Sequence, residues 1–223
     1  PLTPSNATES LDKQQLASLI ATLVDKHPHL RPEVVAQLPR PTIQSVTSAL
    51  NTLHRRLLAA FPYSRNGPGR DDYTFHRVRP VLDELRTNLL QYGEHFVQAS
   101  EHSVTAFAYL ALAATIIEQM PHWDNPEHDR AYRSDLYRRL AERWQLAVDV
   151  ATKRAAEGKI YGEQTVSEWY RCLERHSAQA NGALDDVLAS FRKGLGWMIG
   201  VHPTVPTVNP IPSGHGLFSS GIY

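Results

Sequence analysis

The feature that most constrains this chain is the uncharged, mostly apolar run of residues 104–117. In a helix of this sequence apolar side chains point in every direction, and such a helix is either buried centrally or spans a membrane. The run is shorter than the roughly 20 residues that a span requires. We therefore expect a core helix covered on all sides by other helices. Its expected core residues are Phe107, Leu110, Ala111, Ala114 and Ile117.

Composition and charge exclude several classes of protein. The 23 Lys and Arg residues balance 23 Asp and Glu residues, whereas nucleic-acid-binding proteins usually carry a basic excess, so we expect no nucleic-acid partner. Cys172 is the only cysteine, which excludes an intrachain disulfide. Prolines stand between stretches of helical periodicity and predict an all-α protein. The chain begins with Pro1 rather than Met, so we expect a fragment or a processed form of a longer protein.

Residues 1–62 predict a small N-terminal helical dimerisation module. Two stretches have apolar residues at helical spacing, and in the second the steps of three and four form a short heptad seam. Packing within the same chain and pairing with a second chain both remain open. We favour the dimer, because a module this small has too little core of its own. The expected interface residues are Leu16, Leu19, Ile20, Leu23, Ile43, Val46, Leu50, Leu53 and Leu57.

The rest of the chain predicts a linker and a helix bundle. Residues 63–71 are rich in turn-forming residues and mark the domain boundary. Residues 72–195 carry repeated helical periodicity around the core run and predict the bundle. Within it we expect a long helix over residues 129–157 and a last helix over residues 165–193, which Thr165 and Glu168 would begin with a capping box.

Residues 196–223 differ from the bundle in composition. They contain no Asp, Glu, Lys or Arg, are rich in Pro and Gly, and keep several apolar side chains. Disordered tails are usually charged and poor in apolar residues. Two interpretations remain open: the tail lies extended across the bundle, or it engages a partner.

No sequence pattern points to catalysis. A Gly-rich phosphate loop, a nucleophile elbow and paired zinc-binding cysteines are all missing from the sequence. The one cluster with metal-ligand chemistry comprises His122, Asp124, Glu127 and His128. Prolines on both sides of it favour a rigid connector between helices. We therefore expect no enzyme activity, no metal and no cofactor.

Six short stretches together resemble one known family. They are residues 12–16, 27–30, 38–41, 61–63, 72–79 and 121–128. Their order and spacing are similar to those of the tethering factors of the nuclear proteasome found in yeasts and other fungi. The family-motif residues that we single out are Tyr73, Phe75, Arg77, Arg79, Pro121, Trp123, Asn125, Pro126 and His128.

The resemblance implies a dimerisation module followed by a bundle similar to 14-3-3 proteins. It implies a non-enzymatic adaptor that brings proteasomes to the nucleus and nuclear envelope and promotes ubiquitin-dependent breakdown of nuclear proteins. The adaptor would also occur in the cytoplasm, consistent with a role in protein transport. The implied partners are the proteasome and a second copy of the chain, with a nuclear import receptor and membrane lipid or sterol as further ones. The alternative function is a peripheral helical bundle that binds membrane lipid or sterol.

Overall fold

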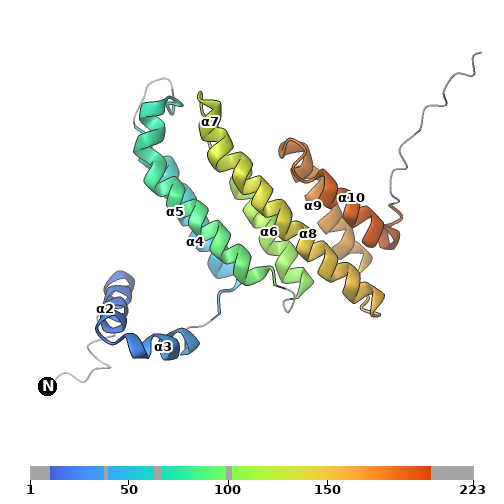
Figure 1. Cartoon of the computed structure of the whole chain (residues 1–223), viewed down its shortest axis with the longest axis horizontal. Helices are drawn as coiled ribbons and strands as arrows, with labels where there is room; N and C mark the ends of the chain where they lie inside the picture. Colours follow the sequence, from blue (N-terminus) through green and yellow to red (C-terminus); the bar gives the residue numbers. More distant parts are fainter. Residues whose placement is uncertain (1–10, 38–39, 63–66, 99–101, 202–223) are drawn as a thin grey trace, which may run out of the picture. The chain divides into compact units, whose positions relative to one another are not determined.

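The computed structural model describes residues 11–37, 40–62, 67–98 and 102–201 (Figure 1). Every regular element within these ranges is a helix, which confirms the all-α prediction. The chain divides into two compact units, residues 1–42 and residues 43–223. No helix in the described part combines the length and hydropathy that a bilayer crossing requires.

The first unit consists of α2 (Lys13–Lys26), the 3-10 turn η1 (Pro28–Leu30) and α3 (Arg31–Gln37). Asp12 begins α2 with a capping box: its carboxylate accepts a hydrogen bond from the Gln15 amide at 2.8 Å, and the Gln15 side chain accepts one from the Asp12 amide at 3.0 Å. These helices are short and enclose little. None of the described side chains of residues 11–42 is buried.

The second unit is a helix bundle that contains all the remaining elements. They are α4 (Ile43–Ala60), α5 (Asp72–Phe96), α6 (Ser103–Glu118), α7 (Pro126–Asp129), the π-helix η2 (Arg130–Ser134), α8 (Asp135–Ala156), α9 (Glu163–Gln179), α10 (Asp185–Gly194) and η3 (Gly196–Ile199). Helix α6 contacts α4, α5, α8 and α9. It is the centre of the bundle.

The core role predicted for residues 104–117 is confirmed, with one correction. Phe107, Leu110, Ala114 and Ile117 are buried, but Ala111 is only half-buried. Side chains at positions 104, 108, 111 and 115, which lie on one side of the helix, keep some exposure. An all-apolar sequence does not reveal which narrow stripe its neighbours leave open.

Helix α4 belongs to the bundle, so the observed division of the chain differs from the expected boundary at residue 62. The helix runs along α5 and also contacts α6 (Figure 1). Val46, Leu50 and Leu57 are each at most 1% exposed because these neighbours cover them. The turn-rich stretch at residues 63–71 therefore connects two packed helices within one unit.

Two predicted helices also differ from the structure. The helix expected over residues 129–157 is divided: Asp129 ends α7, a π-helix follows over Arg130–Ser134, and α8 begins at Asp135. The helix expected over residues 165–193 is two helices, because Asn181 (φ 49°) and Gly182 (φ 84°) adopt the left-handed conformation, which a right-handed helix cannot include. Helix α9 begins at Glu163, after Gly162 as the N-cap, and Thr165 lies inside its first turn, so the expected capping box at Thr165 is wrong.

Candidate functional site

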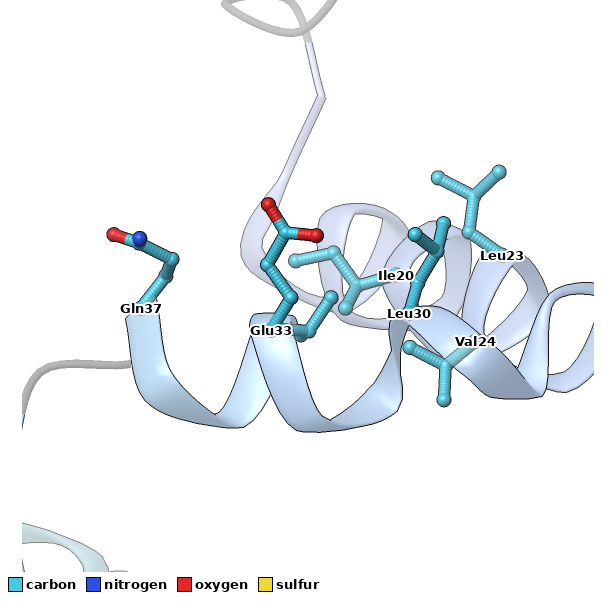
Figure 2. Close-up of a pocket in the computed structure, with 7 residues that line it drawn as sticks. Ile20, Leu23, Val24, Leu30, Glu33 and Gln37 are labelled. Atoms are coloured by element: carbon cyan, nitrogen blue, oxygen red, sulfur yellow. The ribbon is translucent and has the colours of Figure 1, made fainter.

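The first candidate surface is an apolar groove between α2 and α3. A hollow of about 490 Å³ lies between the two helices. Figure 2 shows Ile20, Leu23 and Val24 of α2 facing Leu30 at the end of η1, with Glu33 and Gln37 along α3. The lining is mostly aliphatic. The groove offers shape and apolar area rather than reactive groups.

Four apolar residues of α2 that the sequence predicts at a dimer interface are exposed. The exposed fraction runs from 37% for Ile20 to 47% for Leu23, with Leu16 and Leu19 between them. The stripe is open to solvent along the helix, and no described side chain of residues 11–42 is buried. An exposed apolar surface of this kind usually marks an interaction site.

The five predicted interface residues of α4 have a different environment. Val46, Leu50, Leu53 and Leu57 are buried within the bundle, and Ile43 packs against the same core half-buried. These side chains already have intrachain partners on α5 and α6. The two predicted stripes thus belong to different compact units.

The second candidate surface lies at the end of the bundle where α5 begins, and it centres on Phe75. The buried Phe75 ring stacks on the His128 imidazole, with ring centroids 3.5 Å apart and an interplanar angle of 8°. Trp123 and Tyr132 meet its ring edge to face at 5.1 Å and 5.6 Å. Phe61 stacks on Trp123 at 5.9 Å. Aromatic pairs in these geometries stabilise beyond their buried area.

Hydrogen bonds also join the connector before α7 to the start of α5. The Asp72 carboxylate accepts hydrogen bonds from His128 Nε2 at 2.8 Å and from Asn125 Nδ2 at 3.3 Å. These bonds, that from His128 first, lower the pKa of Asp72 from its usual value. The Asp124 amide donates to the Arg70 carbonyl at 3.0 Å. The connector before α7 is therefore bound to the start of α5.

Other family-motif residues lie outside this aromatic cluster. Tyr73 is 67% exposed on α5, and Arg77 and Arg79 are exposed on the same helix. Pro126 is the first residue of α7, where its fixed φ suits a helix start, and Pro121 is half-buried in the connector. The structure thus brings four motif residues together, namely Phe75, Trp123, Asn125 and His128.

Two residues of η2 hold this end of the bundle through hydrogen bonds that sequence reasoning did not predict. The Tyr132 hydroxyl donates to Asp83 at 2.6 Å. Arg133 donates to the carbonyls of Met120 and Glu118 at 2.9 and 3.1 Å, which satisfies the C-terminal end of α6. A π-helix shifts the register of the following residues, and no periodicity in the sequence signals that shift.

Metal-ligand chemistry does not gather in the connector. His122 pairs with Asp129 at 3.3 Å, whereas His128 faces Asp72 across the connector. Among the residues that the structure describes, no group of three or more His, Cys, Asp or Glu side chains could hold a metal ion. The arrangement binds two segments of the chain to each other and leaves Tyr73 outward as a contact group.

Comparison with known families and proteins gives consistent matches. The model of the family described as "Cut8, nuclear proteasome tether protein" matches residues 1–196. A protein of Pyrenophora teres f. teres named "Tethering factor for nuclear proteasome sts1" is 31% identical over 200 residues, which cover 89% of this chain and 62% of the relative.

Two further relatives carry the same kind of name. That of Sclerotinia sclerotiorum is 29% identical over 201 residues, covering 90% of this chain and 64% of the relative. That of Phaeosphaeria nodorum is 30% identical over 200 residues, covering 89% of this chain and 63% of the relative. The chain thus spans between 62% and 64% of the length of these curated relatives.

Proposed function

Because the chain belongs to the Cut8 family of nuclear proteasome tether proteins, we propose that it acts as a non-enzymatic adaptor that holds proteasomes in the nucleus. The observation that carries this proposal is the family match over residues 1–196. The names of the relatives, all tethering factors for the nuclear proteasome, support it. A tether functions by binding, and the chain has exposed surfaces for contact in both compact units.

The finer parts of the proposal concern where in the cell the adaptor acts and which process it promotes. The adaptor delivers proteasomes to the nuclear envelope and so promotes ubiquitin-dependent breakdown of nuclear proteins. A nuclear import receptor carries it from the cytoplasm. The resemblance of the motif stretches at residues 72–79 and 121–128 supports these parts.

Self-association through the first unit is the second element of the proposal. Within the described residues of the first unit the apolar stripe of α2 stays exposed, and a unit of this size closes its core only with a partner. A second copy supplies a matching stripe, as in an isologous dimer. The α4 seam has its own cover, so we place the dimer contact on α2 and α3 alone. Two bundles on one hub raise avidity for a large particle.

Acidic substitutions in the apolar stripe of α2 test the dimer contact. The double variant Leu19→Asp, Leu23→Asp buries two carboxylates in any apolar contact and should give a monomer in light scattering at about 50 µM. Ser18→Asp, on the opposite side of α2, is the matched control and should stay dimeric. A monomeric unmodified chain, or a dimeric double variant, contradicts this contact.

The tethering role is tested by capture of purified proteasomes on the immobilised chain and on a longer protein that contains it. We expect the longer protein to retain proteasomes and the monomeric variant to retain fewer. Vesicle flotation of the same samples tests the alternative. Flotation without proteasome capture contradicts the tether and favours a peripheral lipid-binding bundle.

A further inference from the structure

His176 is a buried titratable residue that neither candidate surface uses. It lies in the last turn of α9, which packs against α6 and α10 (Figure 1), and it is 0% exposed. Glu118 at the end of α6 faces it, with the carboxylate Oε2 3.5 Å from the imidazole Nδ1. Because burial disfavours the charged form of an imidazole, the packing here depends on the protonation state of one ring.

The neighbouring arginine determines which ring nitrogen carries the hydrogen. Arg175 Nη2 lies 3.1 Å from His176 Nε2. A guanidinium can only donate, so Nε2 is the acceptor of this bond and the hydrogen of the neutral ring is on Nδ1. Nδ1 is buried and makes no hydrogen bond within the described part of the chain, although it faces Glu118. The neutral ring thus lies between a cation and a carboxylate.

The other helices around this ring add no further charge that faces it directly. From η2, Arg133 donates to the backbone carbonyl of Glu118 at 3.1 Å. On α8, burial first and the Glu118 carboxylate in addition raise the pKa of Tyr137, so its hydroxyl stays neutral. On α10, Asp185 accepts a hydrogen bond from Ser177 at 2.6 Å. The η3 turn carries no charged residue.

A proton added to Nε2 ends the bond to Arg175. Both groups are then cationic donors at a distance of 3.1 Å, and neither can accept. The exposed Arg175 side chain can turn into solvent, but the ring is enclosed by the core. Burial and, next, the Arg175 charge lower the pKa of His176, while Glu118 opposes them. A state in which the ring has left this environment therefore binds the proton more tightly, and acid shifts the population toward that state.

The geometry points to a pH-sensitive latch at the end of α9: protonation of His176 releases Arg175 and loosens the last turn of α9 from α6. The chain that follows suits a local opening. The Ala180 amide donates to the His176 carbonyl at 3.0 Å where α9 ends, and the left-handed residues Asn181 and Gly182 come next. Local openings of this kind start at helix ends. The latch belongs to the second unit and does not depend on the tethering role.

Nitrogen-15 NMR of the His176 ring in the whole chain tests the charge balance. We expect the neutral ring to carry its hydrogen on Nδ1 and to titrate with a midpoint below 6.5. Arg175→Met removes the cation and should raise the midpoint, whereas Glu118→Gln removes the carboxylate and should lower it. Arg171→Met, at an exposed position of the same helix, is the control and should leave the midpoint nearly unchanged, because solvent screens its charge.

Amide hydrogen exchange tests the loosening. Between pH 7 and pH 5 we expect the protection factors of residues 173–180, corrected for the intrinsic exchange rates, to fall by roughly threefold or more relative to those of α8. His176→Gln should abolish this fall. The glutamine carbonyl can accept from Arg175 and its amide can donate to Glu118, and neither group titrates in this range.

Three results would overturn the latch. The first is a neutral His176 ring that carries its hydrogen on Nε2. The second is a midpoint that fails to move in opposite directions in Arg175→Met and Glu118→Gln, two variants at positions that are not buried and that therefore keep the test valid if His176→Gln does not fold. The third is a fall in protection at the end of α9 that is the same in His176→Gln as in the unmodified chain.

Discussion

The partition of the two apolar stripes can be tested by removing one leucine from each. Leu50 of α4 is 0% exposed, whereas Leu23 of α2 is 47% exposed. A Leu→Ala change at a fully buried site costs about 2–5 kcal/mol, from lost transfer free energy and the cavity left behind. For a unit of this size, each kcal/mol lowers the melting temperature by about 2–4 °C. Leu50→Ala should therefore lower the bundle's melting temperature by roughly 5–15 °C.

Tryptophan fluorescence gives an assay that sees the bundle alone, since all four tryptophans lie after residue 42. Leu23→Ala should leave this transition within about 2 °C, because α2 is outside the bundle. The reasoning is refuted if Leu50→Ala leaves the melting temperature unchanged but dissociates a dimer. It also fails if Leu23→Ala lowers the transition as much as Leu50→Ala does.

Three further predictions follow from the bundle. Burial opposes ionisation of Asp135, but hydrogen bonds from three arginines, that from Arg86 first, lower its pKa from 3.8 to about 2. This carboxylate therefore contributes about 2 kcal/mol of stability above pH 3.8, and the contribution is lost as the pH falls toward 2. In urea unfolding, Asp135→Asn should remove the loss of stability between pH 3.8 and pH 2. Burial first, and then Arg175, lower the pKa of His176 below 6.5 against the opposing effect of Glu118. The stability that the folded protein has above pH 6.5 should therefore decline as the pH falls below 6.5. The melting temperature of the His176→Gln variant should fall less between pH 7 and pH 5 than that of the unmodified chain. Gly182→Ala places a side chain at φ 84° and should cost about 1–2 kcal/mol in urea unfolding.

Periodicity predicted the all-α fold and the central helix, because an uncharged apolar helix has no stable position except among other helices. It could not assign the partner of the α4 stripe. A seam such as Leu50 and Leu57 shows that a face is buried but not whether the same chain or another covers it. In the structure α5 of the same chain covers the α4 face, and the local sequence of α4 does not show which helix packs against it.

The motif stretches were predictable as a set, but their packing was not. Residues 72–79 and 121–128 are about 50 positions apart, and the stacking of Phe75 on His128 depends on the path of α6 between them. The break between α9 and α10, in contrast, had a signal. Asn181-Gly182 is a dipeptide that favours left-handed turns. Apolar periodicity continues on both sides of it, and the pattern therefore predicts one helix.

The most direct test of the tethering role is the distribution of proteasomes in living fungal cells. Proteasomes carrying a fluorescent subunit are imaged before and after depletion of this protein. Re-expression of the unmodified protein is compared with re-expression of the Leu19→Asp, Leu23→Asp variant. We predict that the nuclear-to-cytoplasmic ratio of proteasomes falls on depletion, recovers with the unmodified protein and recovers less with the variant. An unchanged ratio after complete depletion would contradict the account.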